Sequence, residues 1–235
     1  MANIQSDFSP SILHPFYFIR CGLKKSLINY AHFMSGKMMD FGCGTKPYQS
    51  LFNVKEYIGV DYQNEGHSHA NEQIDYFYDG IKLPFNDEYF DSVLSSEVFE
   101  HVFNLNEILT EINRVMKTGG HLLVTCPFVW NEHEVPNDYA RYTQFALHDI
   151  MGKNGFVVVS YKKSGNFVTT LFQMWILYWY TLFHRKSKRF FLVRWLYKLF
   201  IILPANLLGI FLSKIFPLNS SLYLSNIVVA MKTGS

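Results

Sequence analysis

The stretch Met38-Met39-Asp40-Phe41-Gly42-Cys43-Gly44-Thr45 constrains the fold of this chain more than any other. An apolar run ends in an acid, two glycines follow one residue apart, and a threonine that can begin a helix comes next. This order predicts a buried strand, a tight turn and a helix N-terminus. Glycine has no Cβ and tolerates positive φ, so a nucleotide-like ligand can approach the backbone of such a turn closely. The third glycine of a dinucleotide fingerprint is missing, because the run continues with Lys46-Pro47-Tyr48.

From residue 37 onward, strand-like and helix-like segments alternate. This rhythm predicts an α/β fold with a mainly parallel, doubly wound, Rossmann-like sheet. The predicted strands cover 37–41, 57–61, 74–78, 90–95, 121–126, 156–161 and 223–231. The predicted helices cover 46–53, 104–117 and the segment from Thr143 to 153, with Gly119-Gly120 ending the second of them.

Length and composition indicate the size of the domain and the cellular compartment. The 235 residues suffice for one α/β domain with a sizeable core and one appendage. The three cysteines, Cys21, Cys43 and Cys126, are scattered, which indicates a reducing compartment. Acid and proline residues interrupt the first twenty positions, so we expect no signal peptide and a cytoplasmic location.

Four segments follow from these patterns. Residues 1–36 carry apolar side chains at helical spacing and are expected to form either a helix at the domain edge or a flap over the ligand pocket. Residues 37–161 form the core, and 222–235 supply its last strand. Between them, 162–221 form an apolar, basic, helical insert.

Charge is divided sharply along the chain. Residues 1–149 contain all nineteen acidic residues and ten Lys/Arg, whereas residues 150–235 contain eleven Lys/Arg and no acid. This division indicates an anionic partner for the C-terminal part. Because that part is also rich in apolar residues, the division favours a membrane surface over nucleic acid.

Acidic residues stand at or just past the ends of four successive predicted strands: Asp40, Asp61, Asp79 and Glu97. Ligands of open α/β sheets bind beyond the carboxyl ends of the strands. An acid after the second strand can accept both hydroxyls of a ribose, and Asp79 can accept from an adenine amino group. An acidic rim disfavours a pyrophosphate and suits a cationic ligand with a sulfonium and an ammonium. The residues therefore favour S-adenosylmethionine over NAD, and a dehydrogenase is the least favoured class.

The motifs resemble, in order, those of class I S-adenosylmethionine-dependent methyltransferases of the type 11 kind. The matching runs are Asp-Phe-Gly-Cys-Gly-Thr (40–45), Tyr-Ile-Gly-Val-Asp (57–61), Asp79 with Leu-Pro-Phe (83–85), Phe-Asp-Ser-Val (90–93), Glu-Val-Phe-Glu-His-Val (97–102) and Arg-Val-Met-Lys-Thr-Gly-Gly (114–120). The resemblance covers about 37–161 and the last strand. It implies a seven-stranded sheet whose last strand is antiparallel. The usual Gly-x-Gly-x-Gly departs here at Lys46-Pro47.

The same resemblance implies the cofactor site. It assigns the ribose to Asp61 and the adenine to Asp79, and it places the neighbouring residues of these motifs in the cofactor-binding set. That set is Asp40, Gly42, Cys43, Gly44, Asp61, Tyr62, Asp79, Gly80 and Glu97.

The loop 127–143 follows the fifth main strand and is expected on the same rim. Its spacing His-x-x-Pro-x-Asp-Tyr-x-Arg-Tyr-Thr is similar to methyltransferases of bacterial surface-glycan and lipopolysaccharide assembly. Transfer to a hydroxyl requires positioning of that hydroxyl and removal of its proton. His133 is the candidate base, with Asp138 and Arg141 orienting it or the substrate, and His101 is the second candidate. The alternatives are that His133 and Arg141 only pin the loop, and that His101 lines the cofactor pocket.

No metal site is predicted. His67, His69 and Asp75 lie in or beside a polar loop without a further ligand pattern, which is typical of a solvated loop.

The insert has two apolar stretches, 167–183 and 190–216. The first is slightly shorter than the roughly 20 residues that span a bilayer. The second is interrupted by basic residues and a proline. Lys186, Phe190, Arg194 and Lys198 step by four and give one largely basic helical face, which favours an interfacial element over true spans. A buried homodimer or domain contact is the other interpretation.

The function predicted from the sequence is methyl transfer from S-adenosylmethionine to a hydroxyl of a glycan or another small acceptor, with a lipid-linked glycan precursor as one form. The protein would be cytoplasmic and peripheral on the inner face of the membrane. Two alternatives stay open. One is a quinone or lipid O-methyltransferase, because 97–102 is also similar to ubiquinone-pathway enzymes. The other is a non-catalytic cofactor-binding scaffold that docks through the insert.

Overall fold

The computed structural model describes residues 9–63, 72–187 and 191–234. Contacts divide the chain into two compact units. The helical unit comprises Met1–Lys25 and Lys163–Ser225, and the sheet unit comprises Ser26–Lys162 and Asn226–Ser235. The division of the chain into four segments stays a prediction.

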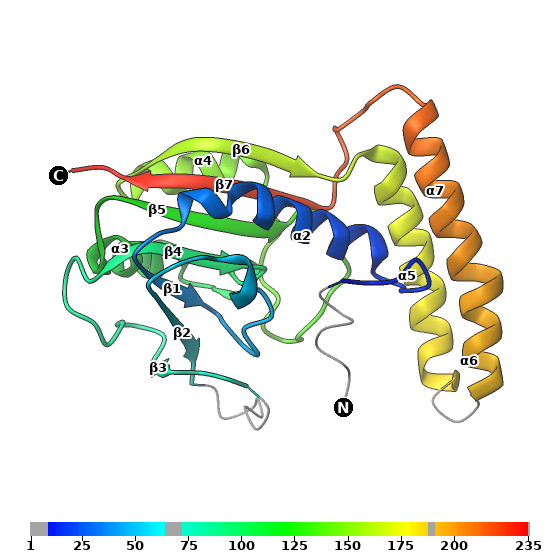
Figure 1. Cartoon of the computed structure of the whole chain (residues 1–235), viewed down its shortest axis with the longest axis horizontal. Coiled ribbons are helices and arrows are strands. Elements are labelled where there is room, and N and C mark those ends of the chain that lie inside the picture. The colour runs from blue at the N-terminus through cyan, green and yellow to red at the C-terminus, as the bar shows by residue number, and fades with distance from the viewer. Residues whose placement is uncertain (1–8, 64–71, 188–190, 235) are drawn as a thin grey trace. The chain divides into compact units, whose positions relative to one another are not determined.

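The sheet unit is built on a seven-stranded sheet with the order β3-β2-β1-β4-β5-β7-β6 (Figure 1). Its strands are β1 Lys37–Phe41, β2 Glu56–Tyr62, β3 Tyr76–Tyr78, β4 Phe90–Ser96, β5 Met116–Pro127, β6 Phe156–Ser164 and β7 Ser225–Lys232. The pairs of β1 with β2 and β4, of β2 with β3, and of β4 with β5 are parallel. The last strand, β7, runs antiparallel, so the predicted Rossmann-like fold class is confirmed.

Parallel register brings the carboxyl ends of β1, β2, β3, β4 and β5 to one edge of the sheet. In β1, for example, Asp40 pairs with Gly59 of β2 and with Leu94 of β4. The segments that leave these strands therefore share that edge, and the residues predicted for the cofactor site lie in them or in the last two residues of β1 and β2.

Two helices cover one face of the sheet. These are α3 (Leu105–Val115) and α4 (Gln144–Lys153). Apolar residues of α3 recur at helical spacing and are buried, among them Ile108, Ile112 and Val115, and they join one core cluster with strand residues such as Val93 and Val124. The predicted start of α4 is confirmed, because the Thr143 hydroxyl accepts the N–H of Ala146.

Two local predictions are wrong. Residues 46–53 form only a 3₁₀ turn, η2 (Gln49–Leu51), instead of a helix. Gly119-Gly120 lie inside β5 and do not end α3, which stops at Val115. There the chain passes directly into the sheet, since Met116 pairs with Phe90 and a register shift follows before His121 pairs with Ser92.

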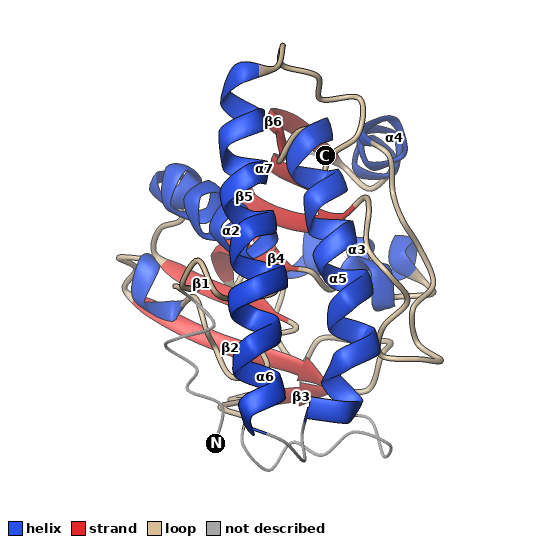
Figure 2. Ribbon diagram, turned by 90° about the vertical axis from the view of Figure 1, so that its right-hand side faces the viewer, coloured by secondary structure: helices blue, strands red, loops and turns tan. Residues whose placement is uncertain are grey.

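The helical unit contains three apolar helical segments and the start of a fourth helix. They are α5 (Phe167–Ser187), α6 (Phe191–Tyr197), α7 (Leu203–Ile215) and the first half of α2 (Tyr17–Tyr30). Figure 2 shows α5 beside the column formed by α6 and α7. The π-helical segment η4 (Lys198–Ile202) joins α6 to α7.

Polar contacts within this unit fix the N-terminal segment to the helices. Gln173 of α5 accepts the N–H of Ile19 at 3.3 Å and donates to the carbonyl of Pro15 at 2.8 Å. Asn206 of α7 donates to the carbonyl of Ile12 at 2.6 Å. Both side chains are fully buried.

One helix among the described residues is long and apolar enough to cross a membrane by length and composition. It is the continuous run Leu192–Ile215, of 24 residues and mean hydropathy 1.8. Of the basic face predicted at 186–198, Phe190 lies outside the described residues.

Candidate functional site

The turn after β1 needs glycine at its first position. Gly42 has φ of 75°, and its N–H donates to the carbonyl of Val60 at 2.8 Å. A Cβ on Gly42 would stand 2.3 Å from Cγ2 of Val98, which follows β4. The turn and the segment 97–102 therefore pack too closely for any side chain at this position.

Lys46 occupies the place of the missing third glycine and keeps the glycine backbone conformation. Its φ is 51°, in the left-handed region that costs an ordinary residue about 1 kcal/mol or more. The Lys46 Nζ pairs with Oδ2 of Asp75 at 2.5 Å, and the same oxygen accepts the N–H of Gly59 at 2.6 Å. At Lys46 the turn therefore has the positive φ that a glycine tolerates, and the side chain is held by Asp75.

Asp61, at the end of β2, holds the turn. Its carboxylate accepts the N–H of Gly44 at 2.9 Å and that of Tyr62 at 2.8 Å. Both predicted glycines and the predicted ribose-binding acid therefore lie together. Cys43 is buried between them, and burial raises the pKa of its thiol, so it is no nucleophile.

Asp79 follows β3 and lies exposed at the same edge. Its Oδ1 accepts the N–H groups of Ile81 and Lys82, each at 2.9 Å, and these bonds lower the pKa of the carboxyl. Gly80 has φ of 84°, and a Cβ there would meet the ring of Tyr62 at 2.8 Å. Tyr62, Asp79 and Gly80 are therefore neighbours, as the predicted cofactor set requires.

Asp40 differs from the other predicted rim acids. It lies within β1 and is buried, and the hydroxyl of Tyr57 donates to its carboxylate at 2.5 Å. Burial, followed by the negative charge of Asp61, raises the pKa of Asp40 to about 7. Its carboxyl group is bonded to Tyr57 of β2, and direct contact with the cofactor stays a prediction.

The segment after β4 carries Glu97 and His101. Glu97 has φ of 56°, and its N–H donates to the carbonyl of Thr125 in β5 at 2.8 Å. The 3₁₀ turn η3 (Phe99–His101) follows, with Phe99 and Glu100 buried. This segment lies at the same edge of the sheet as the turns after β1 and β2.

The two candidate bases lie in contact although 32 positions separate them. Nε2 of His101 is 3.2 Å from Nε2 of His133, and their rings meet edge to face. Burial and the neighbouring His101 lower the pKa of His133, so its imidazole is neutral at pH 7. A neutral imidazole is the form that can accept a proton or bind a metal ion.

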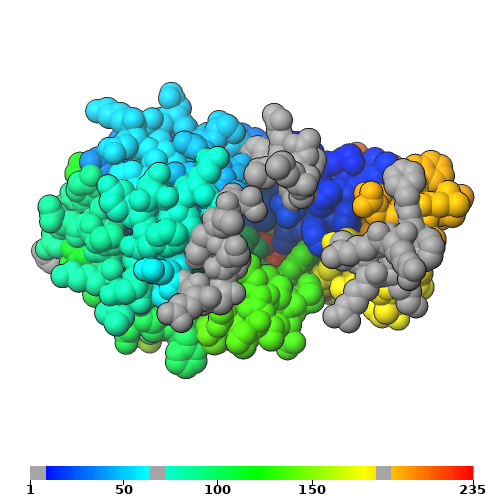
Figure 3. All heavy atoms as spheres, turned by 90° about the horizontal axis from the view of Figure 1, so that it is seen from below, coloured from blue at the N-terminus to red at the C-terminus, as the bar shows by residue number. Residues whose placement is uncertain are grey.

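Asp138 and Arg141 hold the loop that carries His133, which forms part of the surface in Figure 3 (green). Arg141 donates to both carboxylate oxygens of Asp138, at 2.6 and 2.7 Å, and this pairing holds the pKa of Asp138 well below its usual range. Asp138 also accepts the backbone N–H of His133 at 3.0 Å. These contacts hold His133 and its loop in place, and a part of Asp138 and Arg141 in catalysis stays a prediction.

Sequence reasoning missed Glu100 as a site residue. Its side chain is fully buried, and Oε1 lies 3.7 Å from Nε2 of His101 and 4.0 Å from Nε2 of His133. Burial and the charge of Glu97 raise the pKa of Glu100. The Glu-His pair at 100–101 was the only available signal, because burial of a charged residue is not visible in a sequence. His67 and His69 lie outside the described residues.

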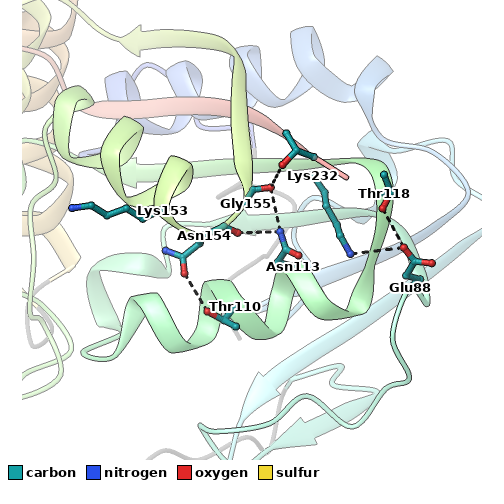
Figure 4. A pocket seen from close by; sticks show the side chains of 9 residues that line it. Glu88, Thr110, Asn113, Thr118, Lys153, Asn154, Gly155 and Lys232 are labelled. Carbon is teal, nitrogen blue, oxygen red and sulfur yellow. Dashed lines mark hydrogen bonds and ion pairs between the residues drawn. The ribbon is translucent and has the colours of Figure 1, made fainter. Parts of the chain in front are cut away.

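A separate hollow opens at the opposite edge of the sheet unit (Figure 4). It has a volume of about 340 Å³ and is lined by polar groups such as Asn113, Asn154 and Lys232. These groups bond to one another: Asn113 donates to the carbonyls of Asn154 and Gly155, at 3.0 and 3.3 Å. None of the predicted site residues lines this hollow, so it carries no part of the proposed chemistry.

Comparison with known proteins supports the prediction of a methyltransferase domain. Residues 39–124 match the family model of the methyltransferase domain. An uncharacterised protein of Methanocaldococcus jannaschii is 34% identical over 101 residues, which cover 40% of this chain and 45% of that protein. A sterol 24-C-methyltransferase of Gibberella zeae is 31% identical over 99 residues, covering 36% of this chain and 26% of that protein. The chain therefore spans less than half the length of these curated relatives.

Solved structures share the fold. The phosphoethanolamine N-methyltransferase 2 of Haemonchus contortus, in complex with S-adenosyl-L-methionine, has a TM-score of 0.53 at 17% identity and covers 100% of this chain and 61% of that chain. The cyclase SpnF has a TM-score of 0.54 at 16% identity, covering 92% of this chain and 82% of that chain. Since this fold is found in both a methyltransferase and a cyclase, structural likeness defines the architecture only. The domain match, together with the acidic rim, supports the predicted cofactor, S-adenosylmethionine.

Proposed function

We propose that this protein transfers the methyl group of S-adenosylmethionine to a hydroxyl of a glycan or lipid-linked glycan precursor at a membrane surface. The observation that carries the proposal is the shared edge where Gly42, Gly44, Asp61 and Asp79 lie together beside the contact of His101 with His133. A cofactor site and a proton-accepting group on one edge are the two parts that O-methylation requires.

The charge and the shape of this edge support the proposed cofactor site. Asp61 would accept the ribose hydroxyls while continuing to hold the turn, and Asp79 would accept from the adenine amino group. Gly44 leaves the backbone open to the rest of the ligand, because a Cβ there would meet nothing closer than Oε1 of Glu72 at 4.0 Å, whereas Gly42 lets the turn pack against Val98. The carboxylates at this edge favour the positive sulfonium and ammonium groups over a pyrophosphate.

The loop after β5 supports the proposed acceptor site. His133 is neutral and oriented by Asp138, so it can take the proton of a hydroxyl as the methyl group is transferred. The polar and aromatic composition of this loop favours a sugar acceptor over a quinone. Quinone or lipid acceptors, and a scaffold that binds cofactor without turnover, are the alternatives that the experiments below separate.

The membrane partner is proposed from the helical unit. Large apolar side chains are exposed along its helices: Leu171, Trp175, Tyr178, Leu182, Leu192, Trp195, Phe200, Leu207, Leu208, Phe211 and Ile215. Residues 150–235 contain eleven basic residues and no acid. An apolar surface accompanied by positive charge suits the anionic face of a bilayer.

The cofactor site is tested by isothermal titration of S-adenosylmethionine into Asp61→Ala. Losing a charged acceptor of hydrogen bonds, worth about 1.5–3 kcal/mol each, is expected to weaken binding by at least about tenfold. Asp149→Ala is the matched control, because Asp149 lies exposed on α4, where it pairs with Lys153. Circular dichroism checks that both variants fold. Unchanged affinity in Asp61→Ala would refute the assigned site.

The acceptor site is tested with His133→Gln and a panel of glycan, lipid-linked glycan, quinone and lipid acceptors. We expect methylation of a glycan hydroxyl, a loss of turnover of about 10²–10⁴-fold in His133→Gln, and unchanged cofactor affinity. His148→Gln, on the exposed side of α4, serves as the histidine control. Cofactor binding without turnover on any acceptor would favour the scaffold alternative instead.

A further inference from the structure

We propose that Glu100, His101 and His133 bind one divalent first-row transition-metal ion. Sequence analysis predicted no metal site, and the methyl-transfer proposal does not need one. The inference goes beyond the proposed function because metal binding is measured without cofactor or acceptor.

The contacts of the two Nδ1 atoms determine where each imidazole carries its hydrogen. Nδ1 of His101 lies 2.7 Å from the carbonyl oxygen of Asn137, and Nδ1 of His133 lies 3.3 Å from the carbonyl oxygen of Asn131 and 3.3 Å from Oδ2 of Asp138. These oxygens can only accept, so each Nδ1 carries the hydrogen. Nη2 of Arg141 is 3.5 Å from Nδ1 of His133, and its shorter bond goes to Asp138.

It follows that both Nε2 atoms carry lone pairs. These atoms face one another at 3.2 Å, and two lone pairs repel at that distance unless a positive centre is shared between them. A proton or a metal ion can supply that centre. The buried Glu100 beside both nitrogens distinguishes the two possibilities.

Glu100 brings a third ligand atom to the same place. Its Oε1 is buried and has no hydrogen-bond partner among the residues described, although a buried polar atom is costly without one. Oε1 is 3.7 Å from Nε2 of His101 and 4.0 Å from Nε2 of His133. A single shared proton between the histidines would leave this oxygen unsatisfied, whereas a cation would bind all three atoms.

The spacing fits a metal ion. In a triangle with sides of 3.2, 3.7 and 4.0 Å, the point equidistant from the corners lies about 2.1 Å from each. Zinc binds imidazole nitrogen at roughly 2.0–2.1 Å and carboxylate oxygen at roughly 2.0–2.2 Å. The three atoms can therefore reach one ion without rearrangement of the backbone.

Outer contacts of the kind found around metal-binding histidines are already in place. The Nδ1 of such residues usually donates to a carbonyl or carboxylate, which fixes the ring. Asn137 does this for His101, and Asp138 does so for His133 while Arg141 holds Asp138. Glu134, exposed with Oε2 at 3.8 Å from Nε2 of His101, stands at the open side.

Two imidazoles and one carboxylate select Zn²⁺, Mn²⁺ or Fe²⁺ over Mg²⁺ and Ca²⁺, which prefer oxygen ligands. A bound ion would also change the role of His133, because a nitrogen that binds metal has no lone pair left for a proton. The ion would then take over the activation of an acceptor hydroxyl by lowering the pKa of that hydroxyl.

The test is titration of the chelator-treated, dialysed full-length protein with Co²⁺, followed by visible absorption, and with Zn²⁺ by calorimetry. We expect one equivalent to bind, with the absorption of a nitrogen- and oxygen-ligated ion. Glu100→Gln and His133→Gln should each weaken binding by about 10–100-fold. His148→Gln, a histidine on α4 outside the cluster, should bind as the unmodified chain does.

Two results would overturn the proposal. One is binding of less than one equivalent of either ion to the folded protein. The other is one equivalent whose affinity and absorption are unchanged in both Glu100→Gln and His133→Gln, since the ion would then lie elsewhere. Cofactor titration of the same samples reports separately on the proposed function.

Discussion

Asp40 shows at the residue scale how burial redefines an acid. The sequence places it at the end of a strand, where it resembles Asp61 and Asp79. The structure buries its carboxyl group under the turn and gives it the Tyr57 hydroxyl as a partner. The pKa of this carboxyl group rises from 3.8 to about 7. The folded protein therefore retains the proton at pH values at which the unfolded chain has released it.

We therefore expect the free energy of unfolding to fall as pH rises from about 4 to about 7. Below both pKa values Asp40 is protonated in the folded and in the unfolded chain. Above them the folded chain carries a buried charge. Each unit corresponds to about 1.4 kcal/mol, so the effect is on the order of a few kcal/mol. By urea denaturation, Asp40→Asn should be more stable than the unmodified chain at about pH 8, and the two should be about equal at about pH 3, below both pKa values. An equal difference at both pH values would contradict this assignment.

The turn after β1 is the element on which the candidate site depends. Val98, which follows β4, packs against the turn at Gly42. Asp61, at the end of β2, accepts the N–H of Gly44. Lys46 adopts the left-handed conformation of the absent glycine and pairs with Asp75. The third position of the turn is therefore occupied by a residue under backbone strain that an ion pair holds.

Two substitutions at position 46 separate backbone strain from the ion pair. Both Lys46→Gly and Lys46→Ala lose the contact with Asp75, but only glycine relieves the positive φ. We expect Lys46→Gly to be more stable than Lys46→Ala by about 1 kcal/mol in chemical denaturation. Equal stability of the two variants would show that the turn adopts another conformation.

At the scale of the whole molecule, chemistry and apolar surface are divided between two units. The sheet unit contains the predicted rim acids and the histidine cluster, and the helical unit contains many of the exposed apolar side chains. This division agrees with the charge asymmetry of the sequence. It motivates the proposal that one unit performs the reaction while the other binds the membrane.

The membrane proposal predicts flotation with anionic liposomes. Binding should weaken at high salt, because salt screens the attraction of the basic residues. Replacing Phe200 and Phe211, exposed by 69% and 58%, with serine should reduce flotation strongly. Replacing Phe103 and Phe145 of the sheet unit, exposed by 83% and 75%, is the matched control. Absence of flotation under all salt conditions would exclude the membrane partner.

The sequence by itself indicated the strand segments along the chain, the turn after β1 and the acids at the end of β2 and after β3. These features are local, because periodicity and glycine placement act within a few residues. It misplaced the end of α3, since β-strand pairing of Met116 with Phe90 overrode the Gly119-Gly120 signal. Only the tertiary structure brought His133 to His101 and buried Glu100 between them and the core. Contacts across 32 positions, and the desolvation of a carboxylate, depend on which segments the sheet places side by side, and no local pattern encodes that.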